Sequence, residues 1–292
     1  MAPQLWSVVL RVPMPDRAAA ELMLDTETSG QVLALSSFAE PPARSIRWVI
    51  EALLEEPPSA EMQERIRRWC RDHGAEEAAC VALTSEDWVV RSQALNPAVH
   101  VGRYAIHGSH LARPSARVAL TIDASNAFGT GNHGSTRGCL TALDRLARNA
   151  RPRRVLDLGC GTGILAMAAA RTWPGTVVAS DIDRVAVAIA ATNARRNGLG
   201  RRIRFIAGAG FRPPALRGSA PYDLVLANIL ARPLIRLAPA IRRHLARGGR
   251  LVLSGLLPEH TTWVETAFRR QGLVVVERRT IAEWRTLLLR RP

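Results

Sequence analysis

The chain has 292 residues, a formal net charge of +15 and 40 basic side chains, all of them Arg. No apolar run reaches the roughly 18 residues that a membrane span needs, and the N-terminus lacks the pattern of a signal peptide. The absence of Lys excludes an internal Schiff base, and hence a pyridoxal-phosphate enzyme of the usual kind. Four Cys without a C-x-x-C pair argue against a disulfide scaffold or a zinc ribbon. We therefore expect a cytoplasmic protein without membrane association.

The charge is unevenly distributed along the chain. Residues 1–100 hold 9 Arg against 15 acids, whereas residues 101–292 hold 31 Arg against 10 acids. The Arg excess fits a solvated surface in a protein with biased composition. It also fits a basic part that works near nucleic acid and an acidic part that contacts a basic protein. The change in charge near residue 95 favours a domain boundary there.

The acidic part contains short alternating elements. Residues 59–73 predict an amphipathic helix that Ser59 can cap. The apolar run at 48–55 fits a strand or a helix, and taking it as a strand gives the order β-α-β-β-α-β. That order is typical of a small ferredoxin-like α+β sandwich, which we expect over residues 1–95. The other predicted elements are strands at 5–12, 31–38 and 79–84 and a helix at 15–25.

Residues 96–125 carry short extended pieces and are predicted to be a connecting segment. Regular alternation of strands and helices follows in 126–292. Buried apolar strands separated by helices indicate an α/β domain with a doubly wound, Rossmann-like parallel sheet, and the last two strands add an antiparallel hairpin at its edge. The predicted helices are 136–148, 163–172, 183–197, 233–246 and 259–270, and the strands are 154–158, 176–181, 202–208, 223–229, 250–255, 273–280 and 283–291.

A glycine-rich turn follows the first parallel strand, at the end of the sheet where open α/β proteins bind ligands. It contains Asp157, Gly159, Gly161 and Gly163. Glycine lets a ligand approach the backbone closely, and the helix that follows offers free N–H groups. Ile164 stands where a dinucleotide fingerprint requires its third Gly, which disfavours an NAD dehydrogenase.

Asp181 ends the next strand, 22 residues after Gly159. A carboxylate at this position can accept hydrogen bonds from both ribose hydroxyls of a nucleoside. An Asp before the first Gly, the G-x-G-x-G spacing and this acid together resemble the S-adenosyl-L-methionine motif of Rossmann-like methyltransferases. The alternative is a tight turn without a ligand. Ala209 stands where many such enzymes hold adenine with an acid, so the adenine subsite stays unassigned.

Asn228 lies at the carboxyl end of the fourth parallel strand and is the candidate catalytic residue. Its amide carbonyl can accept a hydrogen bond from an attacking amine and aim the amine lone pair at an activated methyl group. Alternatively, Asn228 caps the helix that begins near Pro233, and both roles are compatible.

The segment 126–139 (NAFGTGNHGSTRGC) almost forms a phosphate loop, but Ser135 stands where the Lys should be. It does not follow a buried strand. His133 has no partner at a metal-ligand spacing, so we predict no metal site. A plain surface loop is one alternative. The favoured interpretation is a second wall of the methyl-donor pocket, in which Thr136 offers its hydroxyl.

These motifs resemble the methyltransferase family that modifies large-subunit ribosomal protein eleven, and the similarity covers nearly the whole chain. The family loop often reads G-T-G-T-H-P-T-T, and here Asn132, Gly134 and Ser135 replace Thr, Pro and Thr, whereas His133 and Thr136 are kept. The segments that carry the resemblance are 86–104, 127–140, 155–166, 179–183, 222–234, 248–257 and the terminal EWRTLLLRR.

The resemblance implies an N-terminal substrate-recognition domain, a flexible linker and a catalytic domain. It implies methyl transfer from S-adenosyl-L-methionine to the α-amine and lysine amines of that ribosomal protein, free or in the ribosome. Within the chain it points to Thr136, Gly159, Asp181 and Asn228 for cofactor binding. Incidental contact with ribosomal RNA by the basic part is compatible with it. Two other hypotheses stay open: a methyltransferase with another target, and a cofactor-binding module without catalysis.

Overall fold

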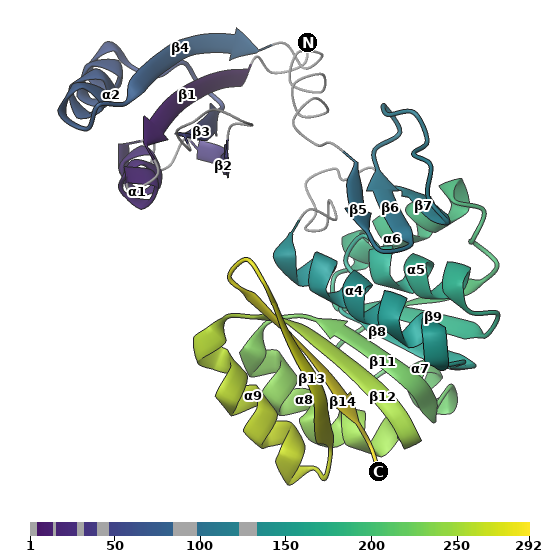
Figure 1. Cartoon of the computed structure of the whole chain (residues 1–292). Helices are drawn as coiled ribbons and strands as arrows, with labels where there is room; N and C mark the ends of the chain where they lie inside the picture. The colour runs from purple at the N-terminus through teal and green to yellow at the C-terminus, as the bar shows by residue number, and fades with distance from the viewer. Residues whose placement is uncertain (1–4, 14–15, 28–31, 40–46, 84–97, 123–132) are drawn as a thin grey trace. The chain divides into compact units, whose positions relative to one another are not determined.

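The structure is a computed structural model that describes residues 5–13, 16–27, 32–39, 47–83, 98–122 and 133–292. The chain divides into two compact units, Met1–Leu95 and Asn96–Pro292 (Figure 1). None of the described helices combines the length and apolar character that crossing a membrane requires.

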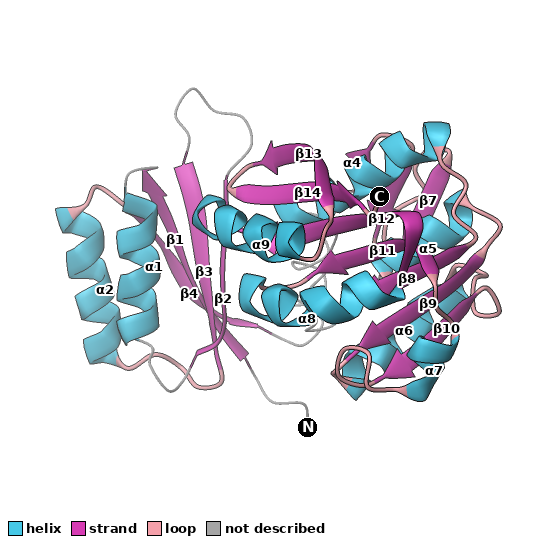
Figure 2. Cartoon of the chain, turned by 90° about the horizontal axis from the view of Figure 1, so that it is seen from below, coloured by secondary structure: helices cyan, strands magenta, loops and turns pink. Residues whose placement is uncertain are grey.

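The first unit contains β1 (Leu5–Pro13), α1 (Arg17–Glu27), β2 (Val32–Ala39), β3 (Arg47–Leu54), α2 (Ala60–Asp72) and β4 (Glu76–Leu83). The strands form one antiparallel sheet in the order β2-β3-β1-β4. Figure 2 shows α1 and α2 side by side on one face of this sheet. The run at 48–55, which fitted a strand or a helix, is a strand, and the elements of this unit follow one another in the order β-α-β-β-α-β.

The core of the first unit lies between its sheet and its helices. Leu10 and Ile50, from neighbouring strands, are fully buried together with Leu24 of α1, and Ile66 of α2 joins the same cluster. Ser59 caps α2 as predicted, because its Oγ accepts a hydrogen bond from the Met62 backbone N–H at 3.1 Å. The cap satisfies one of the N–H groups that a helix start leaves unpaired.

The second unit is built on a seven-stranded sheet, whose order is β10-β9-β8-β11-β12-β14-β13. The strands are β8 (Arg154–Leu158), β9 (Thr176–Asp181), β10 (Ile203–Ala207), β11 (Tyr222–Asn228), β12 (Leu245–Leu256), β13 (Val274–Ile281) and β14 (Trp284–Arg290). Strands β8 to β12 run parallel, and β14 is antiparallel to both β12 and β13. The terminal hairpin thus joins the sheet through its last strand, and the predicted mixed α/β architecture is confirmed.

Helices cover both faces of this sheet, as Figure 1 shows. Alternate side chains of one strand enter opposite cores: Val155 and Leu224 join one cluster, whereas Leu156 and Val225 join the other. This alternation follows from the two-residue period of a strand and requires apolar cover on both sides. The cover comes from α4 (Gly134–Asn149), α5 (Ile164–Thr172) and α6 (Arg184–Arg196) on one face and from α7 (Pro214–Gly218), α8 (Ala231–His244) and α9 (Pro258–Arg270) on the other.

The prediction that 96–125 is a connecting segment is wrong for its described part, residues 98–122. This part forms a three-stranded sheet of β5 (Val99–Val101), β6 (Tyr104–His107) and β7 (Val118–Thr121) and belongs to the second unit. Tyr104 and Leu120 are fully buried in the same core as α4 and α5. Strands of three or four residues are too short to show a clear alternation of apolar and polar side chains. They are stabilised by packing on helices distant in sequence, which local patterns do not reveal.

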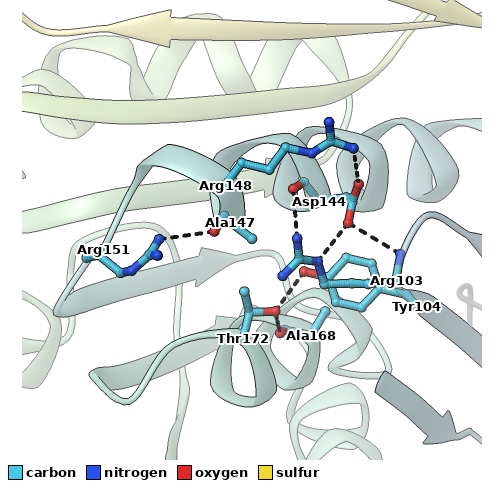
Figure 3. Close-up of polar contacts among 8 residues, drawn as sticks. All are labelled: Arg103, Tyr104, Asp144, Ala147, Arg148, Arg151, Ala168 and Thr172. Atoms are coloured by element: carbon cyan, nitrogen blue, oxygen red, sulfur yellow. Dashed lines mark hydrogen bonds and ion pairs between the residues drawn. The ribbon is translucent and has the colours of Figure 1, made fainter. Parts of the chain in front are cut away.

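Polar contacts attach β6 to two helices (Figure 3). Asp144 of α4 accepts hydrogen bonds from the backbone N–H of Arg103 at 3.3 Å and from its Nε at 2.7 Å. The Tyr104 hydroxyl lies 2.7 Å from Thr172 Oγ1 in α5, and Thr172 donates its own proton to the Ala168 carbonyl. The Tyr104 hydroxyl is therefore the donor in this pair.

Burial raises the pKa of Asp144, but the hydrogen bonds from Arg103 and the charges of Arg103 and Arg148 outweigh it and hold the pKa below its ordinary value. A carboxylate with a lowered pKa stabilises the fold above its unfolded-state pKa. That contribution is lost as the pH falls through the folded-state pKa.

We expect Asp144→Asn to lower the free energy of unfolding of the second unit by about 1–3 kcal/mol at neutral pH, because it leaves Arg103 without its carboxylate. The difference should begin to shrink as the pH falls below about 4, the ordinary pKa of Asp, and should be lost once the pH is below the lowered folded-state pKa. Hydrogen exchange of peptides from the second unit measures the loss of free energy of unfolding and its dependence on pH. Arg148→Gln is the control, because its guanidinium is exposed and 3.6 Å from Asp144, and a loss equal to that of Asp144→Asn would contradict the argument.

Candidate active site

A cavity of about 390 Å³ lies at the carboxyl ends of β8, β9 and β11. Its volume falls in the range of roughly 300–1,000 Å³ that ligand pockets occupy. The segments that form it are the start of α4, the turn after β8, the ends of β9, β11 and β12, and the terminal hairpin. The lining residues are His133, Ser135, Thr136, Gly159, Cys160, Gly161, Thr162, Ile164, Leu165, Asp181, Asn228, Ile229, Leu230, Gly255 and Trp284.

Five of the six predicted cofactor-binding residues line this cavity: Thr136, Gly159, Gly161, Asp181 and Asn228. Gly163 does not. It caps α5 at φ +84°, and a Cβ there would lie 3.0 Å from the Cβ of Ala190 in α6. The geometry thus gives Gly163 a place in the packing of α5 on α6.

Gly159 brings two loops of the site together. Its φ of +76° lies in the left-handed region, and a Cβ would lie 2.2 Å from Cγ2 of Ile229, the residue after β11. The neighbouring backbone N–H groups of Gly159 and Cys160 both donate to the Ser180 carbonyl in β9, at 2.7 and 3.0 Å. The turn is therefore fixed to β9 while it packs on the loop after β11.

The Asp181 carboxylate is held in place by backbone donors. Its Oδ2 accepts from the Gly161 N–H at 2.9 Å, and its Oδ1 accepts from the Asp183 N–H at 3.1 Å. Each carboxylate oxygen has a further lone pair for a ligand hydroxyl. Asp181 is thus a fixed acceptor that reaches the cavity beside the glycine turn.

Asp157 holds the glycine turn from within the core. It is almost fully buried, and its Oδ2 accepts from the Ala166 N–H in α5 at 2.9 Å. Its Oδ1 is buried without a hydrogen-bond partner among the described residues. Burial raises the pKa of Asp157 to about 7, the bond from Ala166 opposes the rise, and the charge of Asp181 adds to it. A buried acceptor without a donor fits an additional cationic or N–H group at this end of the sheet.

Asn228 and Thr136 meet although 92 positions separate them: Asn228 Nδ2 donates to Thr136 Oγ1 at 3.4 Å. The bond is long and does not use the amide Oδ1, which is an acceptor of a residue that lines the cavity. The alternative that Asn228 caps the next helix is wrong, because Leu230 is the N-cap residue of α8.

Of the predicted second wall segment 126–139, the structure describes residues 133–139. Three of them, His133, Ser135 and Thr136, line the cavity, and Gly134 lies between the first two in the chain. Residues 126–132 of that segment lie outside the described residues. Nδ1 of His133 is 2.7 Å from Oγ of Ser135, which is buried. Within the part of the chain that the structure describes, no cluster of three or more His, Cys, Asp and Glu could hold a metal ion.

Trp284 is a site residue that sequence reasoning missed. It comes from the terminal hairpin, lines the cavity, and its ring centroid is 4.4 Å from that of His133 at a tilt of 50°. Gly134 permits this approach, because a Cβ there would lie 2.9 Å from Trp284 Cδ1. In the sequence, the Glu-Trp pair marks Trp284 as part of the hairpin turn, but it does not indicate that Trp284 contacts His133.

The sheet order, the glycine turn and the acid at the end of the second parallel strand define an S-adenosylmethionine-dependent methyltransferase. Comparison with known proteins gives the family. The chain belongs to the ribosomal protein L11 methyltransferase (PrmA) family, whose model matches residues 22–292.

Relatives and a solved structure agree with this assignment. The chain is 41% identical over 277 residues to the ribosomal protein L11 methyltransferase of Rhodopseudomonas palustris, a match that covers 94% of this chain and 92% of the relative. It is 41% identical over 261 residues to that of Bradyrhizobium diazoefficiens, with 88% of each chain covered. The crystal structure of the ribosomal protein L11 methylase of Lactobacillus delbrueckii subsp. bulgaricus superposes with a TM-score of 0.60 at 26% identity, covering 67% of this chain and 99% of that one.

We expect Gly159→Ala to weaken S-adenosylmethionine binding at least about tenfold, because Ile229 must move and the turn with it. Gly272→Ala is the matched control: Gly272 has φ +77°, and no atom lies within 4 Å of its Cβ position. Both variants share a strain of about 1–3 kcal/mol from the left-handed backbone, so only the steric effect differs. Calorimetric titration with the cofactor measures the affinity, and equal affinities of the two variants would refute the steric role.

Proposed function

We propose that the chain transfers methyl groups from S-adenosylmethionine to the α-amine and the lysine side-chain amines of ribosomal protein L11. The observation that carries the proposal is the convergence of the glycine turn, Asp181 and Asn228 on one cavity. The relatives at 41% identity are named ribosomal protein L11 methyltransferase, which supports this substrate. Family membership and cavity together favour catalysis over a binding module.

When bound, S-adenosylmethionine supplies an activated methyl group on its sulfonium sulfur. The residues of the chain would hold it in three ways. The Asp181 carboxylate accepts from the ribose hydroxyls, the turn at Gly159 and Gly161 lets the cofactor lie against the backbone, and Thr136 offers a hydroxyl from the opposite wall.

Asn228 would position the substrate amine. Its Nδ2 is directed at Thr136, so its Oδ1 can accept an N–H of the amine and fix the direction of the nitrogen lone pair. A displacement at an activated methyl needs an in-line approach, and holding the amine in that geometry supplies most of the rate enhancement. Asn228 takes up no proton in this role.

Substrate recognition is assigned to residues 1–95. The strand order β2-β3-β1-β4 with two helices on one face is that of a ferredoxin-like sandwich. Its acidic balance suits a basic ribosomal protein, because complementary charge raises the encounter rate. We place the reaction in the cytoplasm, on free L11 or on the ribosome, where the basic second unit tolerates incidental contact with ribosomal RNA.

Asp181→Ala removes the acceptor of two ribose hydrogen bonds, each worth about 1.5–3 kcal/mol when charge-assisted. We expect cofactor affinity to fall at least about tenfold, as measured by calorimetry. Asp183→Ala is the matched control, because Asp183 caps α6 through Val185 N–H at 2.8 Å and does not line the cavity. That variant should lose about 1 kcal/mol of stability and keep its affinity. An unchanged affinity of Asp181→Ala would place the ribose elsewhere.

The substrate is tested by incubating purified L11 with the protein and S-adenosylmethionine and measuring the intact mass of L11. We expect increments of whole methyl groups that map to its N-terminus and lysines. Ribosomal RNA from the same organism serves as the competing substrate. Methylation of the RNA with unchanged L11 would show that the second hypothesis, another target, is correct.

A further inference from the structure

Two neighbouring cavities lined by arginines lie at the amino end of the parallel sheet, the end away from the candidate active site. Their volumes are about 240 and 280 Å³, and both are lined by Leu146, Ala150 and Arg250. We propose that these cavities bind phosphate groups of an RNA backbone. The phosphate chemistry follows from the side chains of the site, and the choice of RNA rests on the proposed function, whose substrate is a ribosomal protein.

The basic side chains of the two cavities come from separate segments. Arg151 follows α4, and Arg247 and Arg250 belong to the first half of β12; all three line the first cavity. Arg145 of α4 and Arg250 line the second cavity. Arg247 is exposed and Arg250 is half-buried. A guanidinium group presents its N–H donors in a planar fork, which matches two oxygens of one phosphate group.

Arg247 and Arg250 differ from the other two arginines in having no partner among the described residues. Arg145 forms an ion pair with Glu277. Arg151 donates from Nη1 to the carbonyl oxygens of Ala147 and Ala150, at 3.0 and 2.8 Å. Neither Arg247 nor Arg250 forms a hydrogen bond or an ion pair with any residue that the structure describes. Their N–H donors are therefore the ones available to a ligand.

Helix ends explain some of the arginines at this place, but not these two. Both α4 and α8 end here, and the last carbonyl groups of a helix form a negative pole that arginines commonly neutralise. Arg151 has this role at the end of α4, and Arg291 donates to two carbonyl groups at the end of α8. Arg247 and Arg250 make no such bond, so their position needs another reason.

The arginines of this region repel one another. Arg250 lies directly opposite Arg290 in the register of β12 and β14, and like charges in directly opposite positions of a sheet are unfavourable. Burial lowers the pKa of Arg291, and the nearby charges of Arg242 and Arg247 lower it further. A bound anion would relieve this repulsion, because each phosphate group carries a negative charge.

The two carboxylates of the lining do not neutralise Arg247 and Arg250. Asp223 accepts from two backbone N–H groups that precede β8, both through Oδ2, at 2.8 and 2.9 Å. Glu277 forms ion pairs with Arg145 and Arg279. Both carboxylates thus have partners of their own in the described part of the chain.

The backbone that carries Arg247 and Arg250 is fixed. The Gly248 N–H donates to the Arg291 carbonyl oxygen at 2.8 Å, and the Arg291 N–H donates to the Gly249 carbonyl oxygen at 2.9 Å. Figure 1 shows the C-terminus of the chain, where Arg291 lies, next to β12 and β14. A fixed backbone lowers the entropy that a ligand must remove when it binds, so the site is partly preorganised.

The size of the cavities fits groups of a polymer better than a complete small ligand. Each volume is below the roughly 300 Å³ at which pockets for small molecules begin, and the shared lining places the cavities next to each other. Arg154 and Arg202 are exposed at the same end of the sheet, so positive charge continues beyond the cavities. An RNA backbone supplies one negative charge per nucleotide along such a row.

The lining also indicates how RNA would be recognised. No aromatic side chain is among the described residues that line the two cavities, so the site offers no surface for stacking bases. Phosphate contacts position a nucleic acid but carry no sequence information. We therefore expect binding that depends strongly on salt and little on RNA sequence.

The test measures binding of the full-length protein to a fluorescently labelled single-stranded RNA of mixed sequence, by anisotropy at several salt concentrations. We expect Arg247→Gln/Arg250→Gln to weaken binding at least about tenfold at low salt. The slope of log affinity against log salt should fall in magnitude by about 1.4, since each phosphate contact to a single strand contributes about 0.7.

The matched control is Arg184→Gln/Arg236→Gln, which removes the same net charge from exposed positions on α6 and α8 that line neither cavity. Its affinity should stay within about threefold of wild type, with an unchanged slope. Arg247→Gln/Arg250→Gln should keep the S-adenosylmethionine affinity of wild type, because the cofactor cavity lies at the other end of the sheet. If that double variant fails to fold, Arg247→Gln alone, at an exposed position, should lower the slope by about 0.7.

Four outcomes would overturn the proposal. They are an unchanged salt slope of the Arg247→Gln/Arg250→Gln variant, an equal loss of affinity in the control, displacement of the RNA by an equal phosphate concentration of pyrophosphate, and displacement by an acidic peptide as effective as unlabelled RNA. The last would indicate a protein partner. The assay contains neither L11 nor cofactor, so its failure leaves the proposed function intact. RNA binding through these arginines together with unmodified L11 would refute the proposed function alone.

Discussion

The candidate active site depends on the way Ile229 is enclosed between two glycines. A Cβ on Gly159 would lie 2.2 Å from the Ile229 side chain, and a Cβ on Gly255 would lie 2.8 Å from the Ile229 carbonyl oxygen. Both glycines have positive φ, near +76° and +79°, so they permit the close approach without backbone strain. This packing joins the ends of β8, β11 and β12, and it fixes Asn228, the residue before Ile229, in the lining of the cavity.

The parallel sheet also separates the charges of the second unit. Two acids lie toward the carboxyl ends of the strands: Asp181 lines the cavity, and Asp157, just before the glycine turn, is buried. Exposed arginines lie at the amino ends of two strands, Arg154 at the start of β8 and Arg202 just before β10. Asp223 lies at this end and accepts from backbone N–H groups there. The methyl-donor site therefore keeps an acidic local environment in a strongly basic unit, which suits a cationic cofactor and a cationic amine.

The second wall of the cavity comes from two segments that lie far apart in the sequence, the start of α4 and the terminal hairpin. The start of α4 supplies His133, Ser135 and Thr136, and the terminal hairpin supplies Trp284. Because β14 lies between β12 and β13, the hairpin turn reaches α4. Gly138 continues this contact, since a Cβ there would lie 2.0 Å from Thr286 Oγ1 in β14. The second wall thus requires the complete sheet.

The sequence by itself determined the features that local rules control. Hydrophobic periodicity gave the helices and long strands, the Ser59 hydroxyl predicted a helix cap, and the spacing of Gly159, Gly161 and Asp181 predicted a nucleoside site at the end of the sheet. Only the tertiary structure decided that residues 98–122 form a sheet on α4 and α5, that Trp284 faces His133, and that Thr136 meets Asn228. The physical reason is the range of the interactions. Caps, periodicity and glycine turns act over a few residues, whereas these contacts join segments far apart in the chain, whose pairing only the packed core selects.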